Sequence, residues 1–359
     1  MQEHSHGGDA AGWHAPVQTR DERPWSIDPA GFGTPARTDP MWRLSDLDRL
    51  KPLWAETPEA TIAEAAFHPE DLVSAIALQR ATPRRIVADG NVRVEITGDA
   101  ETVTAEQILV EAPAGASSLV ILDHRGPAAL AENVEIRLAE GADLVFVTLQ
   151  RWDDEAIHSA AHQAFVGPGA HLTHIVVSLG GGVVRVNPSV RLDGDGSTAN
   201  LYGLAFADAG QHLESQVFLH HVGRHTKGEV TYKGALQGVG ARTVWVGDVL
   251  IGKDATGTDT YEQNRNLVLT EGARADSIPN LEIATGEIVG AGHASATGRF
   301  DDEQLFYLMA RGIPEVEARR LVVLGFLTEI VQQVPDEALR EELGAALEAE
   351  LMSSLGTAS

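Results

Sequence analysis

The middle of the chain, from about residue 91 to residue 300, alternates hydrophobic and polar residues with a period of two. Val92, Val94 and Ile96 form the first such run, and the segments 144–148 and 172–177 are later ones. Side chains of a β-strand point alternately to its two faces, so this alternation predicts strands with a buried face. The pattern therefore predicts a β-rich middle made of many short strands.

Glycine recurs between these runs at a nearly constant spacing. The glycines at positions 115, 141, 169 and 196 lie 26, 28 and 27 residues apart, and those at 240 and 272 follow after intervals of 44 and 32. A repeat of this length built from short strands indicates a solenoid, in which each coil packs on its neighbours. The unit contains no helix, so the sequence predicts a parallel β-helix, with an insertion or an extra coil between 196 and 240. An antiparallel sandwich with glycine turns is the alternative.

Hydrophobic residues recur every three or four positions on both sides of this middle, which is the spacing of helices. Between residues 41 and 85, prolines 58, 69 and 83 divide the pattern into short pieces. Another helix is predicted from Pro314 to about Val334, and a last one carries leucine at every fourth position from Leu339 to Leu351. Residues 321–327 are all nonpolar, so the helix that contains them is expected to bury two faces, one of them in a partner's groove. The alternative is that the three helices of the tail bury both faces and leave none for a partner.

These patterns predict a mainly β chain with four parts. Residues 1–40, which carry five prolines and five glycines, are predicted to be mostly flexible. Residues 41–90 are predicted to form a helical N-terminal cap, residues 91–300 the β-helix core, and residues 301–359 a helical C-terminal domain.

Charge and hydropathy exclude several classes of partner. The 359 residues carry a formal net charge of −25, and no cluster of Lys and Arg stands out, so a nucleic-acid partner is not expected. No apolar stretch approaches the roughly 20 residues of a membrane span, and no secretory signal is visible, so no membrane partner is expected either. These absences predict a cytoplasmic protein.

The chain contains no cysteine. Thiolates are the usual ligands of iron–sulfur clusters, so we expect no disulfide, no thiolate nucleophile and no cluster held by this chain alone. Residues 247–253 imitate a phosphate-binding loop, but Asp254 stands where a serine or threonine would have to bind magnesium. We therefore predict no nucleotide site and no enzyme activity of its own, and any ATP would be bound by a partner.

His293 is the strongest candidate for a functional side chain. It follows Gly292 at the junction of the β-rich middle and the helical tail, and imidazole is a good ligand for iron. A structural role is the alternative. His158 and His162 have the spacing of a helical zinc motif, but Ser159 replaces the required glutamate, so no such site is predicted. The histidines at positions 171, 174, 220, 221 and 225 lie on predicted strands and are expected to be core or surface residues.

The segment around His293 carries a family resemblance. His293-Ala-Ser-Ala-Thr-Gly298, followed by DDEQLFYLMARGI at 301–313, resembles a motif of the SufB/SufD components of the SUF iron–sulfur cluster assembly system. Upstream, Tyr232-Lys-Gly234, the segment 261–269 and Pro279-Asn-Leu-Glu-Ile283 are similar to further family runs. The family's histidine is commonly preceded, two residues earlier, by a cysteine, and Ala291 stands there. Any thiolate at this site would therefore come from another chain.

The resemblance implies a β-helix core and a non-catalytic, SufD-like subunit of a SufBCD-type complex. Such a subunit pairs with a SufB-like paralogue, docks a SufC-like ABC ATPase that binds the ATP, and can form a homodimer when isolated. An iron–sulfur cluster would form transiently at the shared interface, with His293 as the metal ligand of this chain. A SufB-like scaffold is one alternative, although Asn264 stands where SufB-like chains tend to carry cysteine. A β-helix enzyme acting on carbohydrate or acyl substrates is the other.

The same resemblance places partner-binding residues on the helical tail. They are Leu305, Phe306, Tyr307, Arg311, Leu324, Phe326 and Leu327.

Overall fold

The structure, a computed structural model, describes residues 23–61, 67–299 and 302–356. In these residues, strands β1 to β16 form two eight-stranded sheets. Sheet A contains the odd-numbered strands in the order β1 to β15, and sheet B contains the even-numbered strands in the order β16 to β2. The strands span Arg84–Val87 (β1), Asn91–Thr97 (β2), Thr104–Ala112 (β3), Ser117–Gly126 (β4), Ala129–Leu138 (β5), Asp143–Trp152 (β6), Ile157–Val166 (β7), His171–Ser178 (β8), Val183–Leu192 (β9), Thr198–Ala207 (β10), His212–His221 (β11), Lys227–Leu236 (β12), Arg242–Ile251 (β13), Asp259–Val268 (β14), Arg274–Ile283 (β15) and Gly290–Arg299 (β16).

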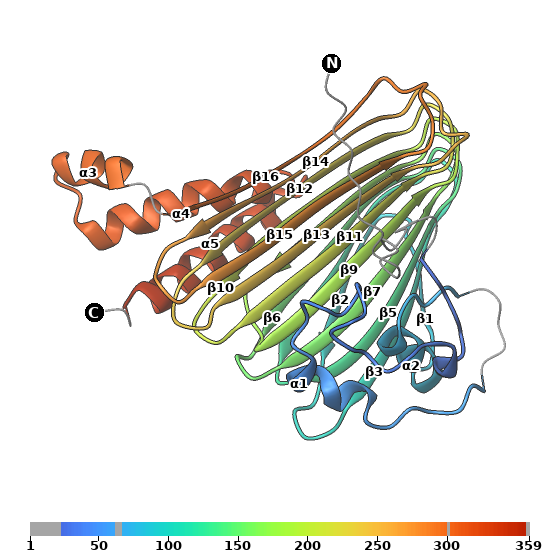
Figure 1. Cartoon of the computed structure of the whole chain (residues 1–359), viewed down its shortest axis with the longest axis horizontal. Helices are drawn as coiled ribbons and strands as arrows, with labels where there is room; N and C mark the ends of the chain where they lie inside the picture. Colours follow the sequence, from blue (N-terminus) through green and yellow to red (C-terminus); the bar gives the residue numbers. More distant parts are fainter. Residues whose placement is uncertain (1–22, 62–66, 300–301, 357–359) are drawn as a thin grey trace, which may run out of the picture.

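Consecutive strands alternate between the two sheets, so one strand from each sheet makes one coil (Figure 1). The neighbouring strands of each sheet pair in parallel. The pair β10 and β12 and the pair β13 and β15, for example, each keep a single register along the whole of both strands. Parallel neighbours need crossover connections and cannot be joined by tight hairpins. The predicted parallel β-helix is therefore confirmed, and the antiparallel sandwich is excluded.

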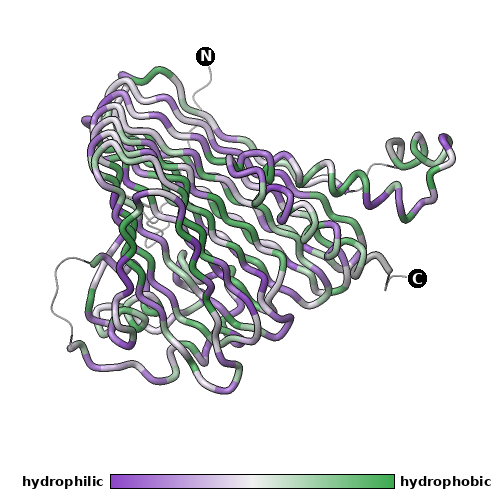
Figure 2. The backbone as a smooth tube through the Cα atoms, turned by 180° about the vertical axis from the view of Figure 1, so that it is seen from behind, coloured by the Kyte–Doolittle hydropathy of each residue, from purple (hydrophilic) through white to green (hydrophobic). Residues whose placement is uncertain are grey.

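The inward-facing side chains of both sheets fill the centre of the solenoid. On β5, Leu130, Val134 and Ile136 are fully buried in this core, and the odd-numbered residues between them point to the outer face. Figure 2 shows the same alternation of hydrophobic and hydrophilic positions along the strands. Burying one such side chain is worth about 1.5–3 kcal/mol, and the stacking of coils repeats that gain along the solenoid.

One corner of the solenoid is built from stacked residues with positive φ. Glycines 115, 141, 169 and 196 occupy it with φ between 59° and 69°, and each donates its backbone N–H to a carbonyl oxygen of the next coil. His225 (φ 54°) takes this position in the following coil, and Gly257 takes it in the coil after that. Gly240 belongs to a second corner, where Gly210 and Gly272 also lie. The long interval between 196 and 240 therefore reflects an extra coil whose corner residue is histidine.

The N-terminal segment covers the outer face of sheet A near the first coils. Its helices are α1 (Leu47–Leu50), the 3-10 turn η2 (Lys51–Trp54) and α2 (Leu72–Arg80). Strand β1 lies inside the range 41–90 that was predicted to be a helical cap, because Pro83 ends the helical pattern and β1 pairs with β3. Of the predicted flexible segment 1–40, residues 1–22 lie outside the described residues, and the rest includes the short turn η1 (Pro29–Gly31).

Arg185 of β9 anchors this N-terminal segment to the solenoid. Its side chain is fully buried, and its guanidinium donates to the carboxylate of Asp71 at 2.7 Å and lies 3.4 Å from that of Glu214. The guanidinium also stacks on the Trp42 ring, 3.8 Å from its centroid. Burial alone would raise the pKa of Glu214, but the hydrogen bond from His212 and the charge of Arg185 lower it to about 2. The positive charge of Arg185 therefore compensates the buried carboxylates of Asp71 and Glu214 where the N-terminal segment meets sheet A.

The C-terminal helices are α3 (Asp302–Ala310), α4 (Glu315–Val331) and α5 (Glu337–Gly356). Helices α4 and α5 pack on the outer face of sheet B, where Val323, Leu343 and Leu347 share a buried cluster with Val147 and Phe206 of the strands. Helix α3 lies beyond the far end of α4, away from both sheets (Figure 1). No helix in the described ranges is long and apolar enough to cross a membrane.

A network of ions fastens α5 to sheet B. The carboxylate of Asp123 on β4 accepts hydrogen bonds from Arg93, Arg125 and Arg151, which lie on the neighbouring strands β2, β4 and β6. Arg93 and Arg151 also donate to Glu342 of α5, each at 2.8 Å. These bonds, those of Arg93 first, lower the pKa of Glu342 to about 2. The tail is thus held by charge as well as by apolar packing.

Replacing Glu342 by glutamine is expected to loosen α5 in a pH-dependent way. A carboxylate with a depressed pKa stabilises the fold fully above its unfolded pKa of about 4.5 and loses that contribution as the pH falls through about 2. Hydrogen exchange of the α5 amides should therefore be faster in Glu342→Gln than in the wild type near pH 7, and the difference should shrink towards pH 2. Glu341→Gln, an exposed neighbour on the same helix, is the matched control. Equal exchange in both variants would contradict the role of the network.

Candidate functional site

Strands β15 and β16 end the two sheets and form the end of the solenoid opposite the first coils (Figure 1). Strand β16 pairs with β14 on one side, and its last seven residues are exposed. Its sequence, GAGHASATGR, contains one charged residue, Arg299, and no proline. Proteins usually protect an exposed edge strand with lysine, proline or a bulge, since its free backbone groups can pair with another chain. Strand β16 lacks the first two devices and is therefore suited to such pairing.

His293 lies on the inner side of this last strand. Its register partner in β14 is Glu262, whose side chain is fully buried, whereas the side chain of His293 is 46% exposed. The imidazole Nδ1 is 3.8 Å from a carboxylate oxygen of Glu262. Two positions further along, Ser295 Oγ lies 2.8 Å from Ser277 Oγ of β15, across the coil. His293 thus presents an imidazole at the open end, with a buried carboxylate behind it.

A cleft of about 360 Å³ lies beside His293. Residues of β11, β13 and β15 line it, among them Phe218, Asp248, Asn280, Leu281 and Glu282. A space of this size is in the range of small-ligand sites. The imidazole is therefore accessible from a cleft as well as from the edge of the sheet.

The open end offers part of a metal site. Imidazole and carboxylate are both ligands for iron, but an iron–sulfur cluster usually takes four ligands, most of them thiolates. In the part of the chain that the structure describes, no group of three metal-ligating side chains forms around His293. His293 and Glu262 could supply two donors at most, so a complete site here would need donors from a second chain.

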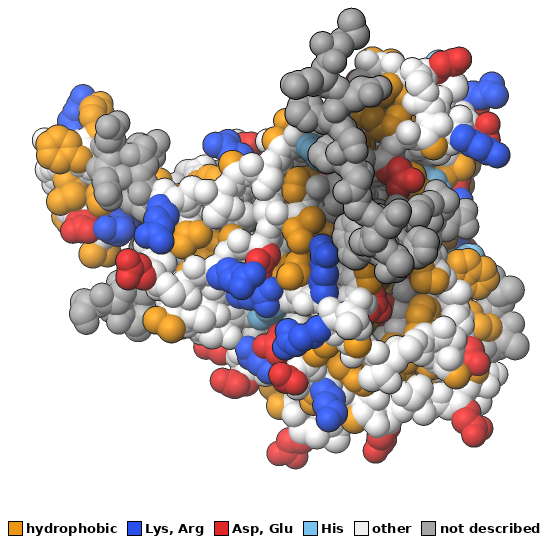
Figure 3. Space-filling view, in the orientation of Figure 1, with side chains coloured by type: hydrophobic (Ala, Val, Ile, Leu, Met, Phe, Trp, Pro, Cys, Tyr) orange, Lys and Arg blue, Asp and Glu red, His pale blue; other side chains and the backbone are white. Residues whose placement is uncertain are grey.

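On α3, the predicted partner-binding residues are mostly exposed. Phe306 is 74% exposed and Tyr307 57%, whereas Leu305 is buried. Arg311 donates to the Tyr307 hydroxyl oxygen at 2.8 Å, and its guanidinium lies 4.9 Å from the centre of that ring. Figure 3 shows hydrophobic side chains gathered on this protruding helix. The exposed side chains of Phe306 and Tyr307 on α3, together with that of Val316 at the start of α4, are called the α3 patch below.

On α4, the predicted partner-binding residues face the chain's own sheet. Leu327 is fully buried against sheet B, and Leu324 and Phe326 pack partly against the same cluster. Lys233 of β12 donates to the Phe326 carbonyl oxygen at 3.0 Å and pairs with Glu329. Leu327 therefore attaches α4 to the solenoid, and the apolar side chains of the predicted set that are most exposed are Phe306 and Tyr307 of the α3 patch.

Residues 247–253, which imitate a phosphate-binding loop, lie mainly on β13, and Asp254 follows that strand at a corner. A phosphate-binding loop has to lie between a strand and a helix, so that backbone N–H groups can surround the phosphates. The chain instead continues from this corner into β14. The arrangement does not form a nucleotide site.

A cluster of buried histidines inside the solenoid was missed by sequence reasoning. His158 and His162 were judged by helical spacing, but both lie on β7, where residues four apart share the inner face. His158 there meets His124 of β4 and Glu132 of β5, and His162 lies 3.0 Å from His174 of β8. Burial lowers the pKa of His162 to about 4. All of these residues have even numbers, as do the inward-facing hydrophobic residues of the same strands, and this shared alternation is the signal that could have identified the cluster.

Comparison with known proteins gives a consistent family. Residues 94–326 match the protein-family model described as "SUF system FeS cluster assembly, SufBD core domain". The chain is 44% identical over 367 aligned residues to an iron–sulfur cluster assembly SufBD family protein of Mycobacterium tuberculosis, with 91% of each chain covered. A protein of the same description from Mycobacterium leprae is also 44% identical, over 91% of this chain and 93% of its own. A second protein so described from Mycobacterium leprae is 29% identical over 62% of this chain and 25% of its own length.

Proposed function

The chain belongs to the SufBD family of the SUF iron–sulfur cluster assembly system, and on this premise we propose that it is the SufD-type subunit of an assembly complex. The observation that carries the proposal is His293, an exposed imidazole on an unprotected edge strand, in a chain without cysteine. Such a chain contributes a ligand to a shared site and does not build a cluster on its own. It is a structural subunit, not an enzyme.

The absence of cysteine favours the SufD type over a SufB-like scaffold. Asn264, where SufB-like chains tend to carry cysteine, is buried and donates to the Tyr232 carbonyl oxygen at 3.2 Å, so it serves the packing of β14 on β12. Thiolates for the cluster would then come from a paralogue. The two family members in Mycobacterium leprae, at 44% and 29% identity, support a pairing of related but different chains.

The paralogue would pair at the open end of the solenoid. The exposed edge of β16 offers backbone hydrogen bonds, and its small side chains allow a second strand to approach closely. This arrangement places His293 and Glu262 at the junction, where the partner's thiolates complete the ligand set for the cluster, which is the product that the complex assembles and passes on. The same edge would support a homodimer when the chain is isolated.

The helical tail would dock a SufC-like ABC ATPase, which binds the ATP. The α3 patch is the surface that supports this assignment: Phe306, Tyr307 and Val316 are more than half exposed, and α3 stands clear of the sheets. Clustered exposed apolar side chains of this kind mark interaction sites. The tail is thus attached to the solenoid by α4 and α5, and α3 is left to contact the partner.

Phe306→Asp is expected to weaken ATPase binding by at least about tenfold, because burying a phenylalanine is worth about 1.5–3 kcal/mol and the aspartate adds a charge that must be desolvated. The test is co-expression of the tagged chain with the paralogue and the ATPase, followed by quantified co-purification. The wild type should retain both partners, and Phe306→Asp should lose the ATPase and keep the paralogue.

Val239→Asp is the matched control for this change. Val239 is 79% exposed at a corner of the solenoid and does not belong to the α3 patch, so the same substitution there should leave both partners bound. Undiminished ATPase binding by Phe306→Asp would refute the docking surface. If the wild-type chain retains neither partner, the proposed function itself is wrong.

A further inference from the structure

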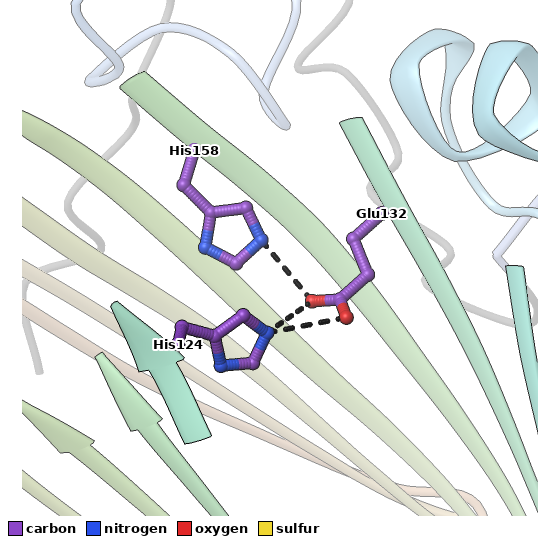
Figure 4. Close-up of side chains that lie close together, drawn as sticks. All are labelled: His124, Glu132 and His158. Carbon is purple, nitrogen blue, oxygen red and sulfur yellow. Dashed lines mark hydrogen bonds and ion pairs between the residues drawn. The ribbon is translucent and has the colours of Figure 1, made fainter. Parts of the chain in front are cut away.

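Three buried side chains meet in the interior of the early coils, at the opposite end of the solenoid from His293. His124 lies on β4 of sheet B, and Glu132 and His158 lie on β5 and β7 of sheet A. All three are fully buried. Figure 4 shows both imidazole rings directed at the same carboxylate group, one from each sheet. No part of the proposed assembly function uses this cluster.

The distances within the cluster are those of metal ligands. His124 Nε2 lies 3.2 and 3.1 Å from the two oxygens of Glu132, and His158 Nε2 lies 3.1 Å from Oε2 of the same group. The three ligand atoms all lie within 4.8 Å of one another. Nitrogen and oxygen ligands sit about 2.0–2.2 Å from a zinc ion and so roughly 3–3.5 Å apart in a tetrahedral site.

The hydrogen bonds of His158 determine where its proton lies. Trp152 Nε1, which can only donate, is 2.8 Å from Gln150 Oε1, and this bond fixes the orientation of the Gln150 amide. His158 Nδ1 lies 2.8 Å from the same oxygen and 3.2 Å from Trp152 Nε1, and the shorter of the two contacts, which is to an acceptor, assigns a proton to Nδ1. In the neutral ring, Nε2 then presents a lone pair to a carboxylate oxygen of Glu132. Two acceptors at that distance need a positive charge between them, which either a shared proton or a bound metal ion supplies.

His124 is held in a matching orientation. Its Nδ1 lies 3.1 Å from the Leu149 carbonyl oxygen, an acceptor for an Nδ1 proton, and 3.3 Å from Gln150 Nε2, which also donates to Thr148 Oγ1 at 2.8 Å; Nε2 faces Glu132. Histidines that ligate metals through Nε2 usually donate Nδ1–H to a backbone carbonyl or another acceptor, which fixes the tautomer and the ring. Both imidazoles of the cluster have such an acceptor, so their outer hydrogen bonds are those of metal-bound histidine.

The charge of Glu132 also calls for a cation. In the described part of the chain, the hydrogen-bond and ion-pair partners of its carboxylate are the two imidazoles, and no Lys or Arg contacts it. A buried carboxylate is costly unless it is paired with a positive charge. A divalent ion bound by two neutral imidazoles and this carboxylate would provide that charge and use every donor in the cluster.

We propose that His124, Glu132 and His158 bind one divalent transition-metal ion of the zinc and iron(II) class. Two imidazoles and a carboxylate suit these ions, whereas magnesium and calcium prefer oxygen ligands alone. The ion links sheet B to sheet A across the interior of the solenoid. Elsewhere along the solenoid, apolar packing holds the two sheets together. Because the site is closed, the metal enters while the chain folds and is afterwards released slowly.

The test is the metal content of the full-length chain, purified from cells grown with zinc and iron and passed over a chelating resin. The wild type should retain one ion per chain, which elemental mass spectrometry identifies as zinc or iron. Glu132→Gln and His158→Gln should retain at least about tenfold less, because loss of even an outer-shell partner costs 10–100-fold in metal affinity. Wild-type protein with no more metal than Glu132→Gln would overturn the proposal.

His162→Gln is the matched control, because His162 lies on the same strand and is equally buried but belongs to the neighbouring pair with His174. It should keep the metal, and an equal loss in this variant would also overturn the proposal. The histidines of residues 1–22 are present in every variant and cancel in the comparison.

A second measurement decides the question if the substituted chains do not fold. Wild-type protein produced in cobalt-supplemented medium should show the visible absorption bands of Co²⁺ bound by nitrogen and oxygen, and its thermal midpoint should exceed that of protein prepared without metal. A colourless protein whose midpoint does not depend on metal would show that hydrogen bonds alone hold the cluster together.

Discussion

Replacing His293 by alanine is expected to stop cluster formation in cells that depend on this assembly system, while the chain still folds and the complex still forms. The side chain is 46% exposed on an edge strand, so its removal opens no buried cavity, and the thermal midpoint should change little. Under the proposed function, the variant loses one imidazole of a shared ligand set, which a neighbouring alanine or serine of β16 cannot replace. The measurements are growth under iron limitation, thermal midpoint and co-purification of the partners.

Two further variants separate metal ligation from a structural role. His293→Cys should restore part of the growth, since a thiolate also binds iron, and Ser295→Ala, two positions along the inner side of the same strand, should grow normally. If His293 were structural, His293→Ala would instead lower the thermal midpoint and release the partners, with growth lost in proportion. Normal growth of His293→Ala under iron limitation would end the site hypothesis.

Replacing Arg185 by alanine is expected to lower the free energy of unfolding by about 3–5 kcal/mol, because it breaks a buried ion pair from one side. The change leaves the carboxylate of Glu214 fully buried without its guanidinium neighbour, removes the donor to Asp71 and exposes the Trp42 ring to a void. Urea unfolding and thermal midpoint measure the loss. A change of this size would release the N-terminal segment from sheet A before the coils separate.

Arg191→Ala is the matched control for Arg185→Ala. Arg191 lies on the same strand, but its side chain is 33% exposed and it pairs with the equally accessible Asp193. Exposed pairs are worth only about 0–1 kcal/mol, so Arg191→Ala should be close to the wild type. If both variants lost the same stability, the buried contact around Arg185 would not be what anchors the N-terminal segment.

The fold could be predicted because its signals are local. A period of two is read from neighbouring residues such as Val92, Val94 and Ile96, and a corner that needs positive φ selects glycine coil after coil. The prediction became ambiguous where that signal changed. His225 takes the place of a corner glycine, so the interval between 196 and 240 could be interpreted as an insertion until the backbone hydrogen bonds showed an extra coil.

The candidate site could be predicted only in part. The family resemblance singled out His293, but its carboxylate neighbour Glu262 is 31 positions away in the sequence and becomes its neighbour only through the register of β14 and β16. The apolar stretch 321–327 was expected to face a partner as well as the chain itself. Leu327 is buried on sheet B, Leu321 of the same stretch is exposed, and Phe306 and Tyr307 of α3 are more exposed still, because packing decides which face of an apolar helix is covered.

By itself, the sequence determined that this chain forms a parallel β-helix with helical ends, that it lacks thiolate ligands, and that His293 lies where the strands stop. Those properties follow from periodicity, composition and chain order, which need no knowledge of distant contacts. Tertiary structure alone decided which inward-facing side chains meet. The alternation of side chains along each strand puts His124, Glu132 and His158 in the interior. Only the stacking of the coils and the distance between the two sheets bring their ligand atoms within 4.8 Å of one another. The face to which a side chain points is a property of its own strand, whereas the distance between side chains of different strands depends on how those strands are placed together.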